Sequence, residues 1–163
     1  MKCLLLLRHA KSSWKDPDIA DHDRPLNKRG KRDAPRMGEL LRREQLVPNS
    51  ILSSTAKRAI TTAELAAKSS GYQGKIHAKE QLYFTEPVTW FGLLQTVSDT
   101  DHCVMIVGHN PGLEEFLKIV TGEEEVLPTA TLVVLTLAID RWEEFDLGVR
   151  GELRQVWRPR ELP

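Results

Sequence analysis

Two arginines and two histidines stand directly after, or shortly after, three apolar segments of the sequence. Arg8 and His9 follow the first segment, Arg58 lies soon after the second, and His109 follows the third. Forked guanidinium groups match the oxygens of a phosphate, and a neutral imidazole can act as a nucleophile. These residue types therefore predict an anion site that transfers a phosphoryl group through histidine.

The segments before these residues have the pattern of strands. Residues 2–7 and 103–107 form short, nearly continuous apolar runs, which is typical of strands covered on both faces, and residues 50–53 are predicted as a second, short strand. Helical patterns at 27–45 and 56–69 separate them, and Asn27 is the expected cap of the first helix. Parallel strands of one sheet end at the same edge, where α/β folds bind ligands. We therefore expect the four side chains to meet in one pocket.

The rest of the chain continues the alternation of strands and helices. Further strands are expected at 75–78, 131–139, 142–147 and 153–157, and further helices at 87–97 and around 113–120. The order predicts an α/β three-layer sandwich with a mostly parallel central sheet, helices on both faces and an antiparallel C-terminal edge. Pro35 lies inside the helix predicted over 27–45, where it should cost a hydrogen bond or kink the helix.

The composition of the chain restricts the class of protein to which it can belong. The chain has 163 residues, 40% hydrophobic and 28% charged, and a formal net charge of zero, which is typical of a soluble globular protein and excludes a disordered chain. Residues 1–80 carry 17 Lys and Arg against 9 Asp and Glu, whereas residues 81–163 carry 6 against 14. The basic half weakly indicates an anion-binding surface, although solvated helix faces explain most of these side chains.

Neither cysteines nor hydropathy point to metal, disulfide or membrane chemistry. Cys3 and Cys103 form no disulfide framework and match no zinc spacing. The chain lacks a clustered carboxylate cage for magnesium and a Gly-rich phosphate loop with a lysine. The apolar run 3–7 is too short for a signal peptide, and no run approaches the length of a membrane span. We expect a cytoplasmic monomer without cofactor or metal.

Four segments carry a resemblance to a known family. Residues 6–10, Leu-Leu-Arg-His-Ala, resemble the Arg-His signature of the histidine phosphatase superfamily, also called phosphoglycerate-mutase-like. Residues 53–64 resemble its Ser-x-x-x-Arg-Ala-x-x-Thr-Ala motif, residues 108–111 its Gly-His motif, and residues 23–30 its Asp-x-x-Leu-x-x-x-Gly segment. The order and spacing agree over about residues 3–121.

The resemblance implies both a branch and a mechanism. Ala10 stands where most members have glycine, which is common in the small bacterial phosphohistidine phosphatase branch, and 1–163 is expected to be one domain without a cap insertion. His9 would attack phosphorus and become a transient phosphohistidine, with its other ring nitrogen donating to a backbone carbonyl. Arg8, Arg58 and His109 would hold the equatorial oxygens. Substrate-binding roles are expected for Ser53, Asn110 and Arg24.

The leaving group decides the substrate class. In the wider superfamily a carboxylate protonates the leaving oxygen, and Glu86 is the nearest candidate by position. Its place beside Pro87, in the first turn of a predicted helix, is better explained by ordinary helix capping. An alkoxide needs an acid, but an imidazole has a conjugate-acid pKa of about 6.5 and leaves more easily. The leading hypothesis is therefore removal of phosphate from phosphohistidine on a protein, which Lys11, Lys15 and Arg24 would steer to the site. Trp14 either contacts that protein or is a partly buried anchor of its loop.

Other functions stay open at this point. The nearest rival is a phosphomonoesterase acting on a small molecule, and a mutase is less favoured because it must exclude water. A phosphate-binding module without turnover is a third possibility, although binding alone does not need the nucleophile His9. The helix at 28–43 carries seven Lys and Arg against two Asp and Glu, but it has no aromatic residue for base stacking, so we expect no nucleic acid or membrane partner.

Overall fold

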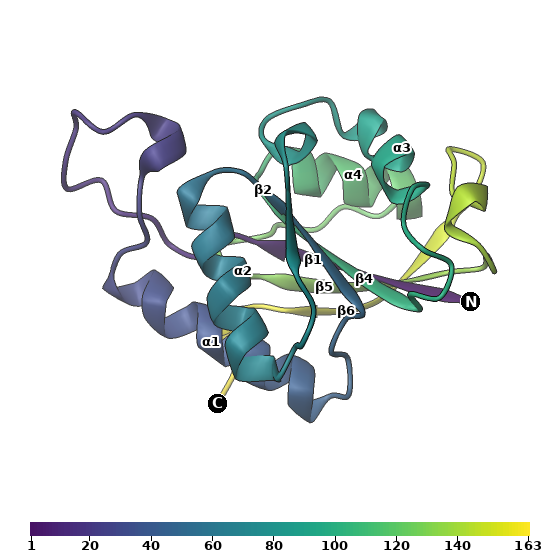
Figure 1. The fold of residues 1–163 in the computed structure, drawn as a ribbon, viewed down its shortest axis with the longest axis horizontal. Helices are drawn as coiled ribbons and strands as arrows, with labels where there is room; N and C mark the ends of the chain where they lie inside the picture. Colours follow the sequence, from purple (N-terminus) through teal and green to yellow (C-terminus); the bar gives the residue numbers. More distant parts are fainter.

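A six-stranded sheet forms the centre of the computed structural model, which describes residues 1–163 (Figure 1). Its strands are β1 (Lys2–Arg8), β2 (Ser50–Ser54), β3 (Ile76–Lys79), β4 (Cys103–Gly108), β5 (Leu132–Leu137) and β6 (Gly151–Trp157). The order is β3-β2-β4-β1-β5-β6, and the first four strands are parallel to one another. β5 runs antiparallel to both of its neighbours, β1 and β6. The predicted mostly parallel α/β sheet with an antiparallel C-terminal edge is confirmed.

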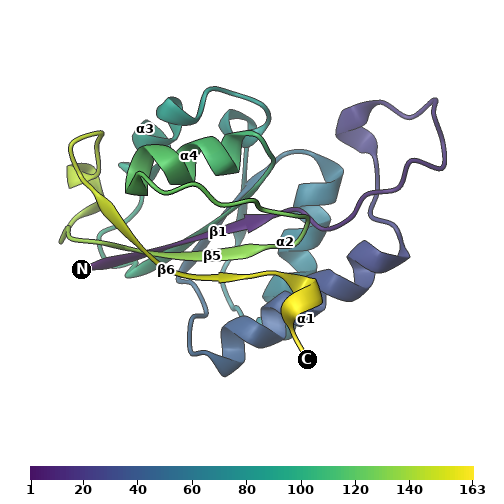
Figure 2. The ribbon, with the colours of Figure 1, turned by 180° about the vertical axis from the view of Figure 1, so that it is seen from behind.

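Helices cover both faces of the sheet. Helices α1 (Lys28–Arg43) and α2 (Lys57–Ser70) lie on one face, and α3 (Trp90–Leu94) and α4 (Gly112–Thr121) lie on the other (Figures 1 and 2). Short 3-10 helices occupy Asp21–Asp23, Glu80–Leu82, Pro87–Thr89, Trp142–Glu144 and Pro159–Glu161. Alternate residues of β1 enter opposite cores, Leu5 and Leu7 toward α1 and α2, and Leu4 and Leu6 toward α3 and α4. A strand buried on both sides must be apolar throughout, which explains the continuous run that predicted it.

Helix α1 begins where its cap predicts. The Asn27 Oδ1 atom accepts a hydrogen bond of 2.9 Å from the Gly30 amide, as an N-cap does. The helix continues through Pro35. At Gly38 an added Cβ would overlap the Ala66 carbonyl, so the absence of a side chain lets α1 lie close against the alanine-rich face of α2.

The C-terminal segment differs from the prediction. Residues 142–147 form no strand. Trp142–Glu144 is a 3-10 helix, and the strand beside β5 is β6. The physical reason is that Trp142 and Phe145, three residues apart, both insert into the core under α3 and α4. Indole Nε1 of Trp142 donates to the Asp101 carbonyl at 2.7 Å, which fixes this turn. The predicted 87–97 helix is shorter, with Pro87–Thr89 leading into α3.

Cys3 and Cys103 are direct neighbours, a relation that the sequence could not establish. They pair in register between β1 and β4, both are buried, and both are free thiols. They lie at the amino ends of the strands, away from the residues predicted to carry chemistry. None of the helices has the length and apolar character needed to cross a membrane.

Candidate active site

The carboxyl edge of the sheet brings the two predicted histidines together. β1 ends at Arg8 and β4 ends at Gly108, and the His9 amide donates to the Gly108 carbonyl at 3.0 Å. This backbone bond places His9 beside the residue that follows β4, His109. Their ring centroids are 5.1 Å apart. The convergence predicted from parallel strands is therefore present for this pair.

The ring of His9 is held as a neutral imidazole with one free nitrogen. Its Nδ1 lies 2.8 Å from the Ala10 carbonyl oxygen, and because a carbonyl only accepts, Nδ1 carries the hydrogen. The lone pair is then on Nε2. The side chain is only 7% exposed, and burial, reinforced by the charges of Arg58 and Arg8, lowers the pKa of His9 to about 4.

Ala10 is itself fixed by helix α2. The Ala10 amide donates to the Thr62 hydroxyl at 2.9 Å, and that hydroxyl donates to the Arg58 carbonyl at 2.7 Å. One threonine thus ties the backbone beside the nucleophile candidate to the helix that carries a phosphate-ligand candidate. Thr62 lies inside the segment 53–64 that carries the family resemblance.

His109 presents its other ring nitrogen to the site. Its Nε2 lies 2.7 Å from Ser54 Oγ, and Ser54 Oγ already accepts from the Ala56 amide at 3.2 Å. Ser54 Oγ can donate its hydrogen to Nε2 while it accepts from Ala56, and in that arrangement the imidazole hydrogen is on Nδ1. Burial, together with His9 and Arg58, lowers the pKa of His109 to about 3. Nδ1 is buried and has no hydrogen-bond partner within the protein.

The arginines add further buried donors without partners. Arg8 is anchored by its Nη1 to the Leu127 carbonyl at 2.9 Å, and its Nε is unpaired. Arg58 is 2% exposed and also has an unpaired Nε, and Arg24 has unpaired Nε and Nη1 atoms. A buried donor left unpaired costs about 1–3 kcal/mol, so a group of them beside two histidines is a strong indication of an anion site.

Two residues of this site were missed by the sequence analysis, Asp21 and Tyr83. The Asp21 carboxylate lies 3.0 Å from Arg58 Nη2 and 3.2 Å from Arg24 Nη2, and it accepts a hydrogen bond of 2.7 Å from the Tyr83 hydroxyl. Partial burial acts to raise the pKa of Asp21, but the hydrogen bonds from Tyr83 and Arg58 outweigh it and lower the pKa. Asp21 therefore holds the two guanidinium groups together as an ion. An acidic residue three positions before a suspected anion-binding Arg24 was the available signal.

Ser53 and Asn110 do not extend into the same cluster of donors. The Ser53 hydroxyl donates to the Ser54 carbonyl at 2.9 Å, and it is Ser54 that reaches His109. Asn110 Nδ2 donates to the Leu127 carbonyl at 2.9 Å, the same oxygen that anchors Arg8. Asn110 is thus placed to position Arg8 through a shared acceptor.

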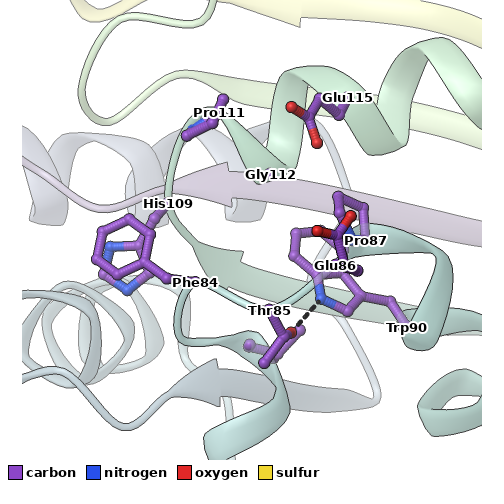
Figure 3. A pocket seen from close by; sticks show the side chains of 10 residues that line it. Phe84, Thr85, Glu86, Pro87, Trp90, His109, Pro111, Gly112 and Glu115 are labelled. Atoms are coloured by element: carbon purple, nitrogen blue, oxygen red, sulfur yellow. Dashed lines mark hydrogen bonds between the residues drawn. The ribbon is translucent and has the colours of Figure 1, made fainter.

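Glu86 lines a cavity beside His109. The cavity has a volume of about 180 Å³, and Figure 3 shows His109 and Phe84 on one side of it and Glu86 and Glu115 on the other. Phe84 lies over His109, with ring centroids 4.8 Å apart. The Glu86 side chain makes no capping hydrogen bond, so the capping explanation of this residue is not what the structure shows. No three His, Cys, Asp or Glu side chains gather as metal ligands would.

Comparisons with known proteins agree with this geometry. The sequence model of the histidine phosphatase superfamily (branch 1) matches residues 4–111. An uncharacterized chloroplastic protein of Arabidopsis thaliana is 33% identical over 150 residues, which cover 86% of this chain and 69% of that protein.

Solved structures show the same fold along the whole chain. The SixA protein of Agrobacterium tumefaciens, named as a phosphohistidine phosphatase, superposes with a TM-score of 0.83 and 29% identity, covering 97% of this chain and 98% of that one. The protein histidine phosphatase SixA complexed with tungstate superposes with a TM-score of 0.86 and 18% identity over 99% of both chains.

Proposed function

The chain belongs to the histidine phosphatase superfamily (branch 1), and from that premise we propose that it removes phosphate from phosphohistidine on a protein. The observation that supports this proposal most is the set of buried, unpaired nitrogen donors on Arg8, Arg58 and His109, beside an imidazole whose Nε2 is free. Such donors fit the equatorial oxygens of a phosphoryl group, where charge develops during transfer.

The proposed reaction has two displacements at phosphorus. Nε2 of His9 first bonds to phosphorus as the bond to the substrate imidazole breaks, and the leaving imidazole takes up a proton. Water then attacks the phosphohistidine, the bond to Nε2 breaks, and inorganic phosphate leaves. Because the lowered pKa of His9 keeps the ring neutral at pH 7, its nucleophilic form is present without a separate base.

Roles for the surrounding side chains follow from their contacts. Arg8, Arg58 and His109 would bind the phosphoryl oxygens, and Arg24 would join them from the loop 10–26. Asp21 holds Arg58 and Arg24 in place, and its negative charge opposes a phosphate on the same groups. Ser54 sets the His109 tautomer, and Asn110 positions Arg8. These assignments are part of the proposal.

The substrate class rests on the leaving group. Glu86 is exposed, and its side chain makes no capping hydrogen bond that would fix its position. A site without a positioned general acid suits an imidazole leaving group better than an alkoxide leaving group. We also propose that residues 1–163 form one domain without a cap insertion, which leaves the site accessible to a phosphorylated side chain of a protein. A cytoplasmic location and a monomeric state complete the proposal, testable by cell fractionation and light scattering.

A small-molecule phosphomonoesterase is the second candidate. The observation that favours it is the cavity beside His109, because Glu86 lines it and could protonate a leaving oxygen there. That cavity would then hold the rest of a small phosphate ester. The two candidates make opposite predictions for the role of Glu86.

The deciding experiment compares two substrates in two proteins. Phosphate release is measured from a histidine-phosphorylated protein and from a sugar phosphate, with the wild type and His9→Ala. Rapid release from the phosphoprotein alone, abolished by His9→Ala, supports the proposal. Preference for the sugar phosphate would replace it with the second candidate. Phosphate binding without release from either substrate would indicate a binding module.

A further inference from the structure

A basic groove lies beside the candidate active site and includes none of the residues that bind the phosphoryl group in the proposed reaction. We use this name for the depression of about 710 Å³ whose wall includes Trp14, Lys15, Lys28, Arg29 and Lys31. It lies where the loop 10–26 meets the start of α1, and Figure 1 shows this loop projecting beyond the end of the sheet.

The floor of the groove is fixed by backbone contacts. Segment 11–13 runs antiparallel to segment 25–27, with a Ser13 amide bond to the Pro25 carbonyl at 2.8 Å and an Asn27 amide bond to the Lys11 carbonyl at 3.0 Å. Gly30 packs directly on Lys11, because an added Cβ there would overlap its carbonyl. The backbone of the groove is therefore preformed, so that binding has to order only side chains.

The groove is joined to the phosphate site through one arginine. The guanidinium carbon of Arg24 lies 3.3 Å from the centre of the Trp14 ring, and Arg24 reaches the Asp21 carboxylate that also binds Arg58. The groove and Arg58 are therefore connected through Arg24 and Asp21, by one stacking contact and two hydrogen bonds.

The charges along the groove are free to meet a partner. Lys15, Lys28 and Lys31 form no ion pair within the protein, and none of the residues that line the groove is acidic. Arg29 is partly neutralised by Asp33, at 3.6 Å. The nearby acidic side chains Asp16 and Asp18 lie further along the loop, outside the lining.

Trp14 adds an exposed apolar side chain to the basic groove. Its side chain is 71% exposed although its ring is apolar and stacks on Arg24. Tryptophan and arginine are among the residue types enriched at the interface positions that contribute most to binding energy. A nucleic acid fits less well, because one aromatic ring offers no series of stacking platforms.

We propose that the basic groove binds an acidic segment of the phosphorylated protein while its phosphohistidine occupies the active site. The inference rests on the proposed function, since it assigns the partner of that reaction. Lys15, Lys28 and Lys31 pair with Asp or Glu side chains of the segment, and Trp14 contacts its apolar atoms.

The test uses phosphohistidine peptides of equal length whose flanking residues are Glu, Ser or Lys. At low salt we expect the KM of the wild type to be about tenfold lower for the Glu peptide than for the Lys peptide, with similar kcat, because several exposed charge pairs each contribute a small part. The difference should shrink as salt is raised. Equal KM values for the peptides would overturn the proposal.

Charge reversal locates the effect on the surface. Lys28→Glu/Lys31→Glu should abolish the preference for the Glu peptide, and both positions are exposed at the start of α1, where acidic residues are well tolerated. The matched control is Lys68→Glu/Lys75→Glu, equal in charge change but at the opposite edge of the sheet. An equal loss of preference in the control would show a net-charge effect and refute the groove.

Binding of the unphosphorylated Glu peptide separates this inference from the proposed function. Calorimetry should show binding to the wild type and the control variant but not to Lys28→Glu/Lys31→Glu, even if no peptide is hydrolysed. Absence of hydrolysis would refute the proposed function, whereas absence of binding in the peptide titration would refute the role proposed for the basic groove. Tighter binding of a single-stranded oligonucleotide than of the Glu peptide would also overturn the inference.

Discussion

Replacing His9 by asparagine should make the stability of the protein less sensitive to acid. Burial lowers the pKa of His9 to about 4 in the folded protein, whereas the ordinary value of histidine is 6.5. As the pH falls through 6.5, the unfolded chain takes up a proton at this residue and the folded protein does not. Folding therefore loses stability between about pH 6.5 and pH 4 because of this one ring.

The size of the effect follows from the pKa difference. A pH of 5 is about 1.5 units below the pKa of this histidine in the unfolded chain, so the ring is protonated there, whereas in the folded protein it is still neutral. The difference corresponds to about 2 kcal/mol of lost stability. Because His9 is only 7% exposed, solvent screens a charge on its ring only weakly. His109 adds a loss of similar size by the same mechanism, and its pKa is lowered to about 3.

Urea unfolding at pH 7.5 and pH 5.0 measures this difference. His9→Asn keeps an amide hydrogen that can donate to the Ala10 carbonyl, so the fold should persist. Its loss of stability between the two pH values should be smaller than that of the wild type by about 2 kcal/mol. Titrating groups away from His9 are common to both proteins and cancel, whereas His109 loses the part of its pKa lowering that His9 causes, which changes the stability in the same direction. An equal loss in the two proteins would refute the neutral, buried state of His9 on which the mechanism depends.

Three further predictions concern the phosphate site. Asp21→Asn should lower the inhibition constant of inorganic phosphate by about tenfold, because each half-exposed carboxylate–guanidinium pair is worth on the order of 1 kcal/mol and competes with phosphate; a weaker inhibitor would show that Asp21 mainly preorganises Arg58. Glu86→Gln should change kcat for a phosphohistidine peptide by less than about threefold, whereas loss of an operating general acid costs about a hundredfold or more. Dialysis against EDTA should leave the rate of phosphate release unchanged, and a rate restored by added Mg²⁺ or Zn²⁺ would contradict the donor set assigned here.

The sheet and its functional edge could be predicted because burial on both faces leaves a strong signal. The runs that became β1 and β4 are apolar at nearly every position, so their place at the centre of a parallel sheet followed directly, and β2, Ser-Ile-Leu-Ser-Ser, was predicted as a short strand between two helical patterns. Once these strands are parallel, their ends meet, and His9 and His109 must lie at one edge.

Details that depend on orientation within an element could not be predicted. Ser53 and Ser54 are both fully buried, so hydrophobic alternation gives no hint which hydroxyl faces His109. Asp21 and Tyr83 meet across 62 positions of the sequence, in a loop and an irregular segment without periodicity. Trp142 and Phe145, three residues apart, would lie on opposite faces of a strand but on one side of a 3-10 turn, and their burial in the same core selects the turn.

The central claim is that phosphate passes through Nε2 of His9. The most direct measurement mixes the wild-type protein with a radiolabelled phosphohistidine peptide, quenches the reaction in alkali within milliseconds, and locates the label by mass spectrometry. The mechanism predicts a transient phosphoryl group on His9 that is stable in alkali, is lost in acid and decays as inorganic phosphate appears. Release of phosphate with no label on His9, or with the label on His109, would contradict it.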